Sequence, residues 1–384
     1  MEARRYAGSS WPRSTAGSWR RWALVYASAA ALAGCGVEFD PASELSGLRV
    51  LAVKKSAPYA RPGEQVDFTL LWHDTDPLRP VPQIAWLAVC ENPPADLFEA
   101  CFTQVPDLPE DELAARVSVP DPGASAANDR FSFVTSSSII SSRPPPGDPS
   151  ATPYGLTYVF FAVCAGQLEL QVDSAAPFVC YEDLDGIAGF GAGDRRRDSR
   201  DYVIGYSAVF AYDALRNENP RVTGVELGGT TFWPDSPAEL AAQAPPGAVL
   251  ASPRDVCIGA GCEPVSASDG EPCPPELTLG ACASGDCAEP ELELLVDPAS
   301  AELDAAASAR AGETLGEQMW VNYYGTAGEI GEEVRLLNDA VEGFSDEVST
   351  DYTPTDTVGT SYLWAVAHDN RGGAEWARLR VCTR

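Results

Sequence analysis

Hydrophobic and polar residues alternate along much of the chain, which is the pattern of β-strands. A first strand at 48–53 is followed by a turn region at 58–63 and by a strand at 66–72. In the latter, Val66, Phe68, Leu70 and Trp72 should share one face. The same pattern recurs at 84–90, 158–164 and 203–211, and 130–134 has the pattern of a short edge strand.

The segment 84–90 carries a specific expectation about its faces. At a strict period of two, Ile84, Trp86, Ala88 and Cys90 lie on one side of the strand. We therefore expect all four side chains to face the same core.

The C-terminal part shows strands of the same kind, at 221–225, 319–324 and 333–337. Its last two strands, 362–367 and 374–382, form a hairpin around His368-Asp369-Asn370-Arg371-Gly372-Gly373, because Asp, Asn and Gly tolerate the positive φ angles of tight turns. Only 237–243 and 301–311 have brief, Ala-rich helical patterns. Many short strands with few helices predict an all-β fold of antiparallel sandwiches.

The length of 384 residues suits two domains. Polar turn formers at 217–220 mark the boundary, so we expect a first sandwich at 46–216 and a second at 217–384. The first contains a Pro- and Ser-rich insert at 103–155, and the second contains a Cys-rich insert at 253–290.

The first 34 residues have the pattern of an export signal. Five Arg and one Glu precede an apolar run of 13 residues, from Trp22 to Gly34. A helix of that length spans about 20 Å, which is too short for a hydrocarbon core of about 30 Å. We therefore expect a signal peptide and not a membrane-spanning helix.

Leu32-Ala33-Gly34-Cys35 resembles the lipobox of bacterial lipoproteins. The resemblance implies cleavage between Gly34 and Cys35, acylation of Cys35, a signal peptide at 1–34 and a lipidated tether at 35–45. The partner would be the lipid bilayer, since several acyl chains give stable attachment. The residue after Cys35 is Gly36 and not the aspartate that retains such proteins at the inner membrane, which favours the outer membrane within the cell envelope. An ordinary cysteine after a plain secretory signal is the alternative.

Ten further cysteines support an oxidising compartment, because an even number fits five disulfides. Cys90 with Cys101 and Cys164 with Cys180 are predicted local pairs, and the other six leave fifteen possible pairings. The four-residue gaps between Cys257 and Cys262 and between Cys282 and Cys287 also suit paired zinc ligands. In an oxidising compartment, however, these thiols would form disulfides before they bind a metal. The ten residues are Cys90, Cys101, Cys164, Cys180, Cys257, Cys262, Cys273, Cys282, Cys287 and Cys382.

The charge excludes one class of partner. The chain has 26 Lys+Arg against 56 Asp+Glu, a formal net charge of −30. Loss of residues 1–34, with five Arg and one Glu, would make it −34. No nucleic acid partner is expected, because phosphate binding needs basic patches.

Motifs for catalysis are few. The chain has two histidines, His73 and His368, both expected to be satisfied surface residues. No Gly-x-Ser-x-Gly elbow, His-Glu-x-x-His pair or phosphate-binding loop is present in the sequence. We predict no catalytic residue and no cofactor, although a close pair of carboxylates could still support a hydrolase.

One acidic segment has part of a calcium-binding pattern. Asp183-Leu184-Asp185-Gly186 matches the core of an EF-hand loop, but its first and twelfth ligand positions hold Tyr181 and Ala192. A metal site is therefore not expected, and a calcium candidate of a different geometry would use Asp183 and Asp185, supplemented by oxygen donors from Asp194, Asp198 and Asp201.

Several segments together resemble the uncharacterised, myxobacterial-type lipoproteins with tandem immunoglobulin-like domains. These segments are 48–53 with Pro62-Gly63, the restart at 219–225, and Leu363-Trp364-Ala365-Val366 leading into 369–373. The resemblance implies two immunoglobulin-like sandwiches with long disulfide-stapled loops behind a lipoprotein signal, and no particular activity. We expect a non-enzymatic envelope component that contacts a protein or glycan, with Trp376 and Tyr352 as exposed candidate contacts. A secreted, carboxylate-dependent hydrolase is the alternative.

Overall fold

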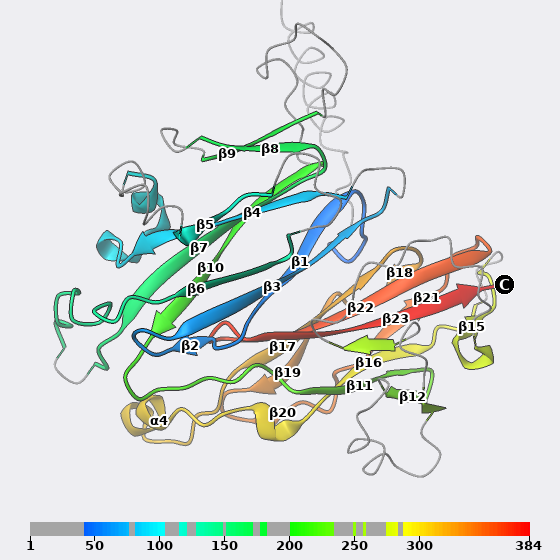
Figure 1. Ribbon diagram of the computed structural model, residues 1–384. Helices are drawn as coiled ribbons and strands as arrows, with labels where there is room; N and C mark the ends of the chain where they lie inside the picture. Colours follow the sequence, from blue (N-terminus) through cyan, green and yellow to red (C-terminus); the bar gives the residue numbers. More distant parts are fainter. Residues whose placement is uncertain are drawn as a thin grey trace, which may run out of the picture. The chain divides into compact units, whose positions relative to one another are not determined.

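The computed structural model is built almost entirely from β-strands, as the sequence predicts (Figure 1). It describes residues 42–76, 81–103, 115–120, 128–148, 151–171, 177–182, 200–233, 249–250, 256–258, 274–282 and 287–384. The predicted signal peptide, its predicted cleavage site and Cys35 lie outside these residues. No helix within the described ranges is long and apolar enough to cross a membrane.

The strands of the N-terminal half form two facing sheets and a hairpin. The sheets have the orders β1-β3-β6 and β2-β10-β7-β4-β5, and the hairpin pairs β8 with β9. All pairings are antiparallel except that of β2 with β10. The strands are β1 (Leu48–Lys55), β2 (Tyr59–Ala60), β3 (Gln65–Asp74), β4 (Gln83–Glu91), β5 (Val117–Ser118), β6 (Arg130–Val134), β7 (Gly155–Cys164), β8 (Gln167–Leu170), β9 (Phe178–Tyr181) and β10 (Tyr202–Ala211).

The core of this half lies between its two sheets. Val66, Phe68, Leu70 and Trp72 of β3 all point into it, as their alternation predicts. Trp86 of β4 stacks on Phe131 of β6 with ring centroids 5.7 Å apart, which joins the two sheets. Fully burying aromatic side chains of this size is a large share of what stabilises a sandwich.

The expectation that Cys90 faces this core is wrong. Ile84, Trp86 and Ala88 face it, but the pairing of β4 with β7 shifts register between Leu87 and Cys90. A bulge of this kind adds a residue and turns the following side chains to the other face. Cys90 therefore lies on the outer face of the five-stranded sheet.

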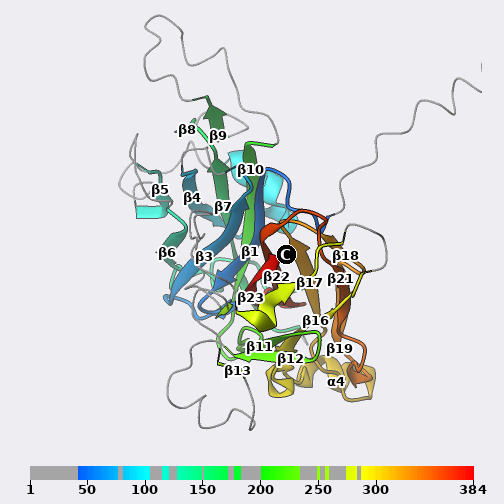
Figure 2. The same cartoon turned by 90° about the vertical axis from the view of Figure 1, so that its right-hand side faces the viewer.

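Disulfides fasten loops to that outer face. Cys90 bonds Cys101 in the short 3-10 segment η2 (Phe98–Thr103), and Cys164 bonds Cys180 in β9, which are the two predicted local pairs. The second bond holds the β8–β9 hairpin, which extends beyond the sheet in both views (Figures 1 and 2). Together these parts cover one end of the outer face and form a second, smaller core there.

The C-terminal half also has two facing sheets, with a core between them. Their orders are β13-β12-β11-β16-β21-β18 and β14-β23-β22-β17-β19-β20, and β15 pairs with β23. The strands are β11 (Val222–Leu227), β12 (Thr230–Trp233), β13 (Val249–Leu250), β14 (Val256–Ile258), β15 (Thr278–Leu279), β16 (Glu291–Val296), β17 (Met319–Gly325), β18 (Glu329–Ile330), β19 (Val334–Asp339), β20 (Gly343–Phe344), β21 (Thr350–Thr353), β22 (Gly359–Asp369) and β23 (Ala374–Thr383).

The Cys-rich insert contributes to this core. Val256 of β14 and Leu277, at the end of η5 (Pro275–Leu277), are buried in it, and β14 and β15 extend the edge of the sheet at β23. Cys282 bonds Cys287. Cys257 and Cys382 each take part in a disulfide as well. The remaining cysteines of the insert, Cys262 and Cys273, lie outside the described residues.

A fourth hydrophobic core joins strands of the two halves. Trp364 and Trp376 of the β22–β23 hairpin pack with Leu51, Ala52 and Leu71 of β1 and β3. The register of β1 shifts between Val50 and Ala52, so β1 can supply Leu48 to the first core and Leu51 to this one. An ion pair between Lys54 and Glu375 lies beside it.

Helices are short. η1 (Pro94–Asp96) precedes η2, and η6 (Pro298–Ser300) precedes α4 (Ala305–Ala311). The Asp304 side chain accepts a hydrogen bond from Ala307 N at 2.7 Å, and Gly312 ends α4 at φ 76°. This helix falls inside the segment predicted at 301–311, whereas the one predicted at 237–243 lies outside the described residues.

Candidate binding site

Aromatic side chains form a band on the outer face of the five-stranded sheet. It begins at the end covered by the disulfides, where Phe98 of η2 and Tyr158 pack against the smaller core, and continues along the sheet. None of these side chains is fully buried, in contrast to the aromatic residues of the cores. We call them the aromatic band: Tyr59, Phe98, Tyr154, Tyr158, Tyr206, Phe210 and Tyr212.

Strand geometry explains why these rings lie together. Tyr206, Phe210 and Tyr212 are even-numbered positions in and just after β10, so they point to one face while Val209 points into the core. Ala208 pairs with Tyr158 of β7, and Phe210 pairs with Tyr59 of β2. Three strands thus present aromatic residues side by side on the same surface.

The rings form two groups. In the first, Phe98 stacks on Tyr206 with centroids 4.6 Å apart, and Tyr158 meets Tyr206 edge-on at 5.4 Å. Tyr206 is 46% exposed, and the neighbouring Leu97 and Ile204 are 56% and 49% exposed. An exposed apolar patch with rigid aromatic rings is typical of an interaction surface.

The second group lies where β10 ends. Tyr59 and Tyr212 have ring centroids 4.8 Å apart, and Tyr154 lies 6.0 Å from Tyr212 and 5.7 Å from Phe210. Aromatic pairs at these distances add about 0.5–1.5 kcal/mol each beyond the area they bury, so the rings hold one another in place.

An ion pair fixes the orientation of Tyr154. Its hydroxyl donates to Asp96 Oδ2 at 2.5 Å, and the Arg143 guanidinium lies 4.1 Å above its ring and pairs with Asp96 at 2.7 Å. Burial and the hydrogen bond to Asp96 raise the pKa of Tyr154 to about 12, so the phenol stays neutral. Arg143 lowers the pKa of Asp96 through its hydrogen bonds. The ring is therefore positioned before any ligand arrives.

A groove of about 450 Å³ lies beside the second group, where the end of β10 approaches α4. We call it the junction groove. Three aromatic rings line it, from Tyr59, Tyr154 and Tyr212. Its charged lining side chains are Asp148, Arg216, Glu302, Asp304, Arg310 and Arg371. A second hollow of about 440 Å³ shares Tyr59, Tyr212 and Arg371 with it and continues along the band to Tyr206.

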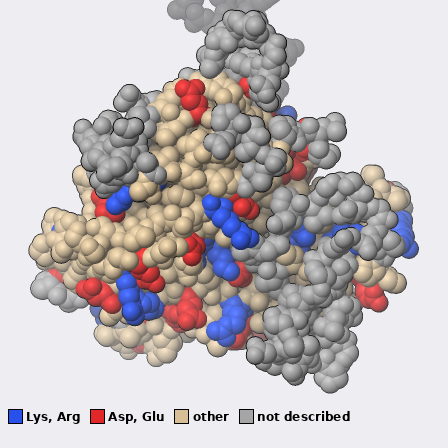
Figure 3. Space-filling model, viewed as in Figure 1, with Lys and Arg blue, Asp and Glu red and all other residues tan. Residues whose placement is uncertain are grey.

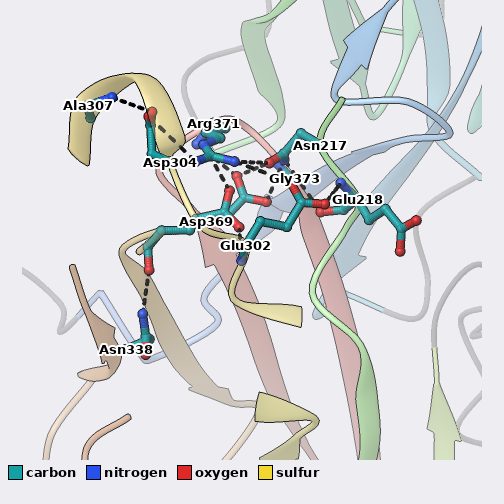
Figure 4. A network of polar contacts seen from close by, with 10 residues as sticks. Asn217, Glu218, Glu302, Asp304, Ala307, Asn338, Asp369, Arg371 and Gly373 are labelled. Carbon is teal, nitrogen blue, oxygen red and sulfur yellow. Dashed lines mark hydrogen bonds and ion pairs between the residues drawn. The ribbon is translucent and has the colours of Figure 1, made fainter. Parts of the chain in front are cut away.

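The turn of the β22–β23 hairpin supplies Arg371 to the lining of the groove. Figure 4 shows the polar contacts around this turn. Asp369 accepts hydrogen bonds from Arg371 N at 2.8 Å, Gly373 N at 2.7 Å and Asn217 Nδ2 at 3.0 Å. Gly372 has φ +90°, and a Cβ there would lie 2.7 Å from Lys55 Nζ, so the turn needs glycine at this position. These contacts hold the backbone that carries Arg371.

Arg371 gathers the carboxylates that surround it. Its guanidinium lies 3.2 Å from Glu302, 3.6 Å from Asp304 and 3.6 Å from Glu317. Glu317 is 1% exposed, and its burial, together with the negative charge of Asp369, raises its pKa to about 8. Lys55, also buried, donates to Ala208 O at 2.7 Å, and burial lowers its pKa to about 8.

Charges of both signs lie close together elsewhere on the surface as well. On the face drawn in Figure 3, Lys and Arg side chains lie beside Asp and Glu in small groups separated by uncharged surface. Several of the described basic residues accordingly form ion pairs, among them Lys54, Arg116 and Arg143.

The residues predicted as chemical candidates do not assemble into one site. His73 and His368 were expected on the surface, but both are half-buried. The His368 ring stacks on Trp320 with ring centroids 5.4 Å apart. Burial lowers the pKa of each imidazole to about 4. Asp183 and Asp185 lie outside the described residues. Among the residues that are described, no group of three or more His, Cys, Asp or Glu side chains could hold a metal ion.

The aromatic contacts predicted from the sequence are wrong. Trp376 is 1% exposed because it packs in the core that joins the two halves, and Tyr352 is 0% exposed because it packs in the core of the C-terminal half. A signal for the true band was present in the period-two spacing of Tyr206, Phe210 and Tyr212. That spacing alone does not say which face of the strand is covered.

Comparisons with known proteins identify no family. No protein-family model matches the chain, and no curated protein matches it. Among solved structures, it is similar to the three N-terminal domains of the bacteriophage RB49 highly immunogenic outer capsid protein (Hoc), at 8% identity. That match covers 88% of this chain and 99% of the other, with a TM-score of 0.15. A score this low supports no conclusion about this protein.

Proposed function

We propose that this protein is a lipid-anchored component of the cell envelope that acts as a non-enzymatic binding module. The aromatic band is its contact surface, and the acylated Cys35 is its attachment to the bilayer, with the outer membrane favoured. The single observation that supports the binding role is the exposure of Tyr206, at 46%, together with Leu97 and Ile204, at 56% and 49%, beside the partly exposed rings of the band. Rigid, part-exposed rings lose little conformational entropy on binding, which is why they dominate contact surfaces.

The carboxyl groups near the junction groove support binding over hydrolysis. Asp369 is 3% exposed and receives three hydrogen bonds from its own turn and from Asn217, and Glu317 is 1% exposed. Glu302 and Asp304 reach the groove but share the Arg371 guanidinium. A hydrolase needs an acid and a base that touch the substrate, and here internal partners engage these groups.

The anchor is tested with the Cys35→Ala variant. We expect unprocessed precursor and no incorporation of labelled palmitate, whereas a Cys257→Ala variant, which changes another cysteine, should still be processed and labelled. Normal processing of the Cys35→Ala protein would refute the lipoprotein assignment.

The contact surface is tested by co-sedimentation of the purified lipoprotein, kept in detergent, with detergent-extracted envelope fragments from producing cells that lack its gene. The extraction removes the bilayer, so that the acyl chains on Cys35 do not contribute to binding. Combined Phe98→Ala and Tyr206→Ala substitutions should reduce binding by about tenfold or more, as loss of a hot spot does. The control is Leu336→Ala on β19, a residue 39% exposed and outside the band. Equal binding by all three proteins, or no binding by the wild type, would overturn the proposed surface.

A further inference from the structure

The junction groove has a lining that fits one class of ligand. We infer that it binds a neutral oligosaccharide, with sugar rings stacked on Tyr59 and Tyr212 and hydroxyls bonded to the charged side chains around them. This inference rests on the proposed binding function and assigns its ligand class.

The charge balance of the groove argues for a neutral ligand. Three acidic side chains, Asp148, Glu302 and Asp304, line it together with three basic ones, Arg216, Arg310 and Arg371. The chain as a whole has a formal charge of −30. The groove is thus balanced locally on a strongly acidic protein, whereas a site for a cationic ligand would keep carboxylates without basic neighbours.

The polar groups argue for a ligand rich in hydroxyls. Carboxylates accept hydrogen bonds and guanidinium groups donate them in a planar, bidentate geometry, so together they match neighbouring hydroxyls, which do both. Arg371 already holds Glu302 and Asp304 in place, which reduces the entropy lost on binding. Within the described residues, the hydroxyls of Tyr59 and Tyr212 make no hydrogen bond, so they too can serve a ligand.

One donor in the groove lacks its acceptor. Arg216 uses Nη1 to donate to Leu215 O at 2.6 Å, but its Nη2 is buried and has no hydrogen-bond partner. A buried donor without a partner costs about 1–3 kcal/mol and is uncommon in folded proteins. The atom is closed to solvent in this conformation, so a ligand oxygen in the groove would satisfy it once the Arg216 side chain turns toward the groove.

The shape argues for an oligosaccharide over a single sugar. The groove of about 450 Å³ and the hollow of about 440 Å³ share Tyr59, Tyr212 and Arg371, so one chain-like ligand can occupy both. Volumes of this size lie within the range of small-ligand sites. A proline-rich peptide would also stack on the tyrosines but has few groups for the six charged side chains.

The test is calorimetric titration of the full-length lipoprotein in detergent. The neutral probes are chitohexaose, cellohexaose, maltohexaose and the neutral polysaccharide fraction of the producing cells' own envelope. The comparison probes are a hyaluronan hexasaccharide, a chitosan hexamer and a proline decapeptide. We expect at least one neutral probe to bind more tightly than all comparison probes. No binding by any neutral probe, or tighter binding by a comparison probe, would overturn the inference.

Variants locate the site. Tyr212→Ala should weaken binding of the neutral probe by about tenfold, the loss of one stacked ring, and Tyr212→Phe should have an intermediate effect. Arg216→Met should weaken binding by about tenfold while leaving the midpoint of unfolding unchanged or higher, because it removes an unsatisfied donor. Leu336→Ala, at a residue 39% exposed on β19 that lines neither hollow, should bind as the wild type does. Unchanged affinity in the Tyr212→Ala and Arg216→Met proteins would refute the groove as the site.

The two proposals can fail separately. If no saccharide binds but envelope binding still depends on Phe98 and Tyr206, the ligand class is wrong and the contact surface stands. If envelope binding does not depend on Phe98 and Tyr206, the proposed function itself is wrong.

Discussion

Arg371 and Glu302 lie 3.2 Å apart in the lining of the junction groove, although they are 69 positions apart in the chain. Arg371 is at the tip of the last hairpin, and Glu302 lies just before α4. The same guanidinium reaches Glu317, which is buried. The pair therefore orders the groove, and the positive charge of Arg371 reduces the cost of ionising the buried Glu317. Both effects can be measured.

Replacing Arg371 should destabilise the fold. The side chain is 11% exposed, and Arg371→Ala would leave Glu302, Asp304 and Glu317 without their shared partner. We expect a loss of about 2–4 kcal/mol in the free energy of unfolding, measured by urea denaturation. Arg221→Ala is the control: Arg221 is 58% exposed and pairs with Asp297 at 2.7 Å, so its loss should cost less than about 1 kcal/mol. Equal losses would contradict the buried role of Arg371.

Glu317 should make stability depend on pH. Its pKa is about 8 in the folded protein against an ordinary 4.5, so between these values only the folded state keeps the proton. Its contribution to stability is therefore fully present below pH 4.5 and is lost as the pH rises to 8. Glu317→Gln removes the ionisable group and should flatten this fall in the free energy of unfolding. In the exposed control variant Glu347→Gln, the free energy of unfolding should change with pH as it does in the wild type. The same pH dependence in Glu317→Gln would disprove the raised pKa of Glu317.

Trp376 should couple the two halves. It is 1% exposed in the core that also contains Leu51 and Leu71, and Trp376→Ala should cost about 3–5 kcal/mol. Amide hydrogen exchange should accelerate in β1 as well as in β22 and β23, because the cavity opens between them. Leu336→Ala, at a residue 39% exposed, is the control and should cost less than about 1 kcal/mol. Acceleration confined to β22 and β23 would count against the shared core.

The disulfide between Cys164 and Cys180 should stabilise more than that between Cys282 and Cys287. The first closes a loop with a sequence separation of 16 and the second one of 5, and loop entropy grows with length. Replacing both members of the first pair by Ser should cost about 2–4 kcal/mol and raise exchange in β8 and β9. The second pair, changed in the same way, should cost less; the reverse order would show that loop length does not decide the effect.

Alkylation of the denatured, unreduced wild type should find no free thiol, because all cysteines after Cys35 are predicted to form disulfides. Two or more free thiols would favour a zinc site.

Local patterning was sufficient to predict most of the long strands, but it did not predict β16 or short strands such as β12 and β21. The segments 48–53, 66–72, 84–90, 130–134, 158–164, 203–211, 319–324 and 362–367 all fall in observed strands, because alternation of apolar side chains is a property of a strand with one buried face. Local spacing was likewise sufficient for Cys90–Cys101 and Cys164–Cys180, whose partners are close in sequence. The hairpin turn at 368–373 followed from its Asp, Asn and Gly residues.

Which face of a strand is covered was decided by tertiary structure. A bulge in β4 turned Cys90 outward, and the joining core buried Trp376, which the sequence alone had suggested as an exposed contact. The aromatic band and the Arg371 cluster combine residues from distant parts of the chain, Tyr59 with Tyr212 and Glu302 with Arg371. Burial on the second face of a sheet depends on what packs there from elsewhere, and periodicity within one strand carries no information about that neighbour.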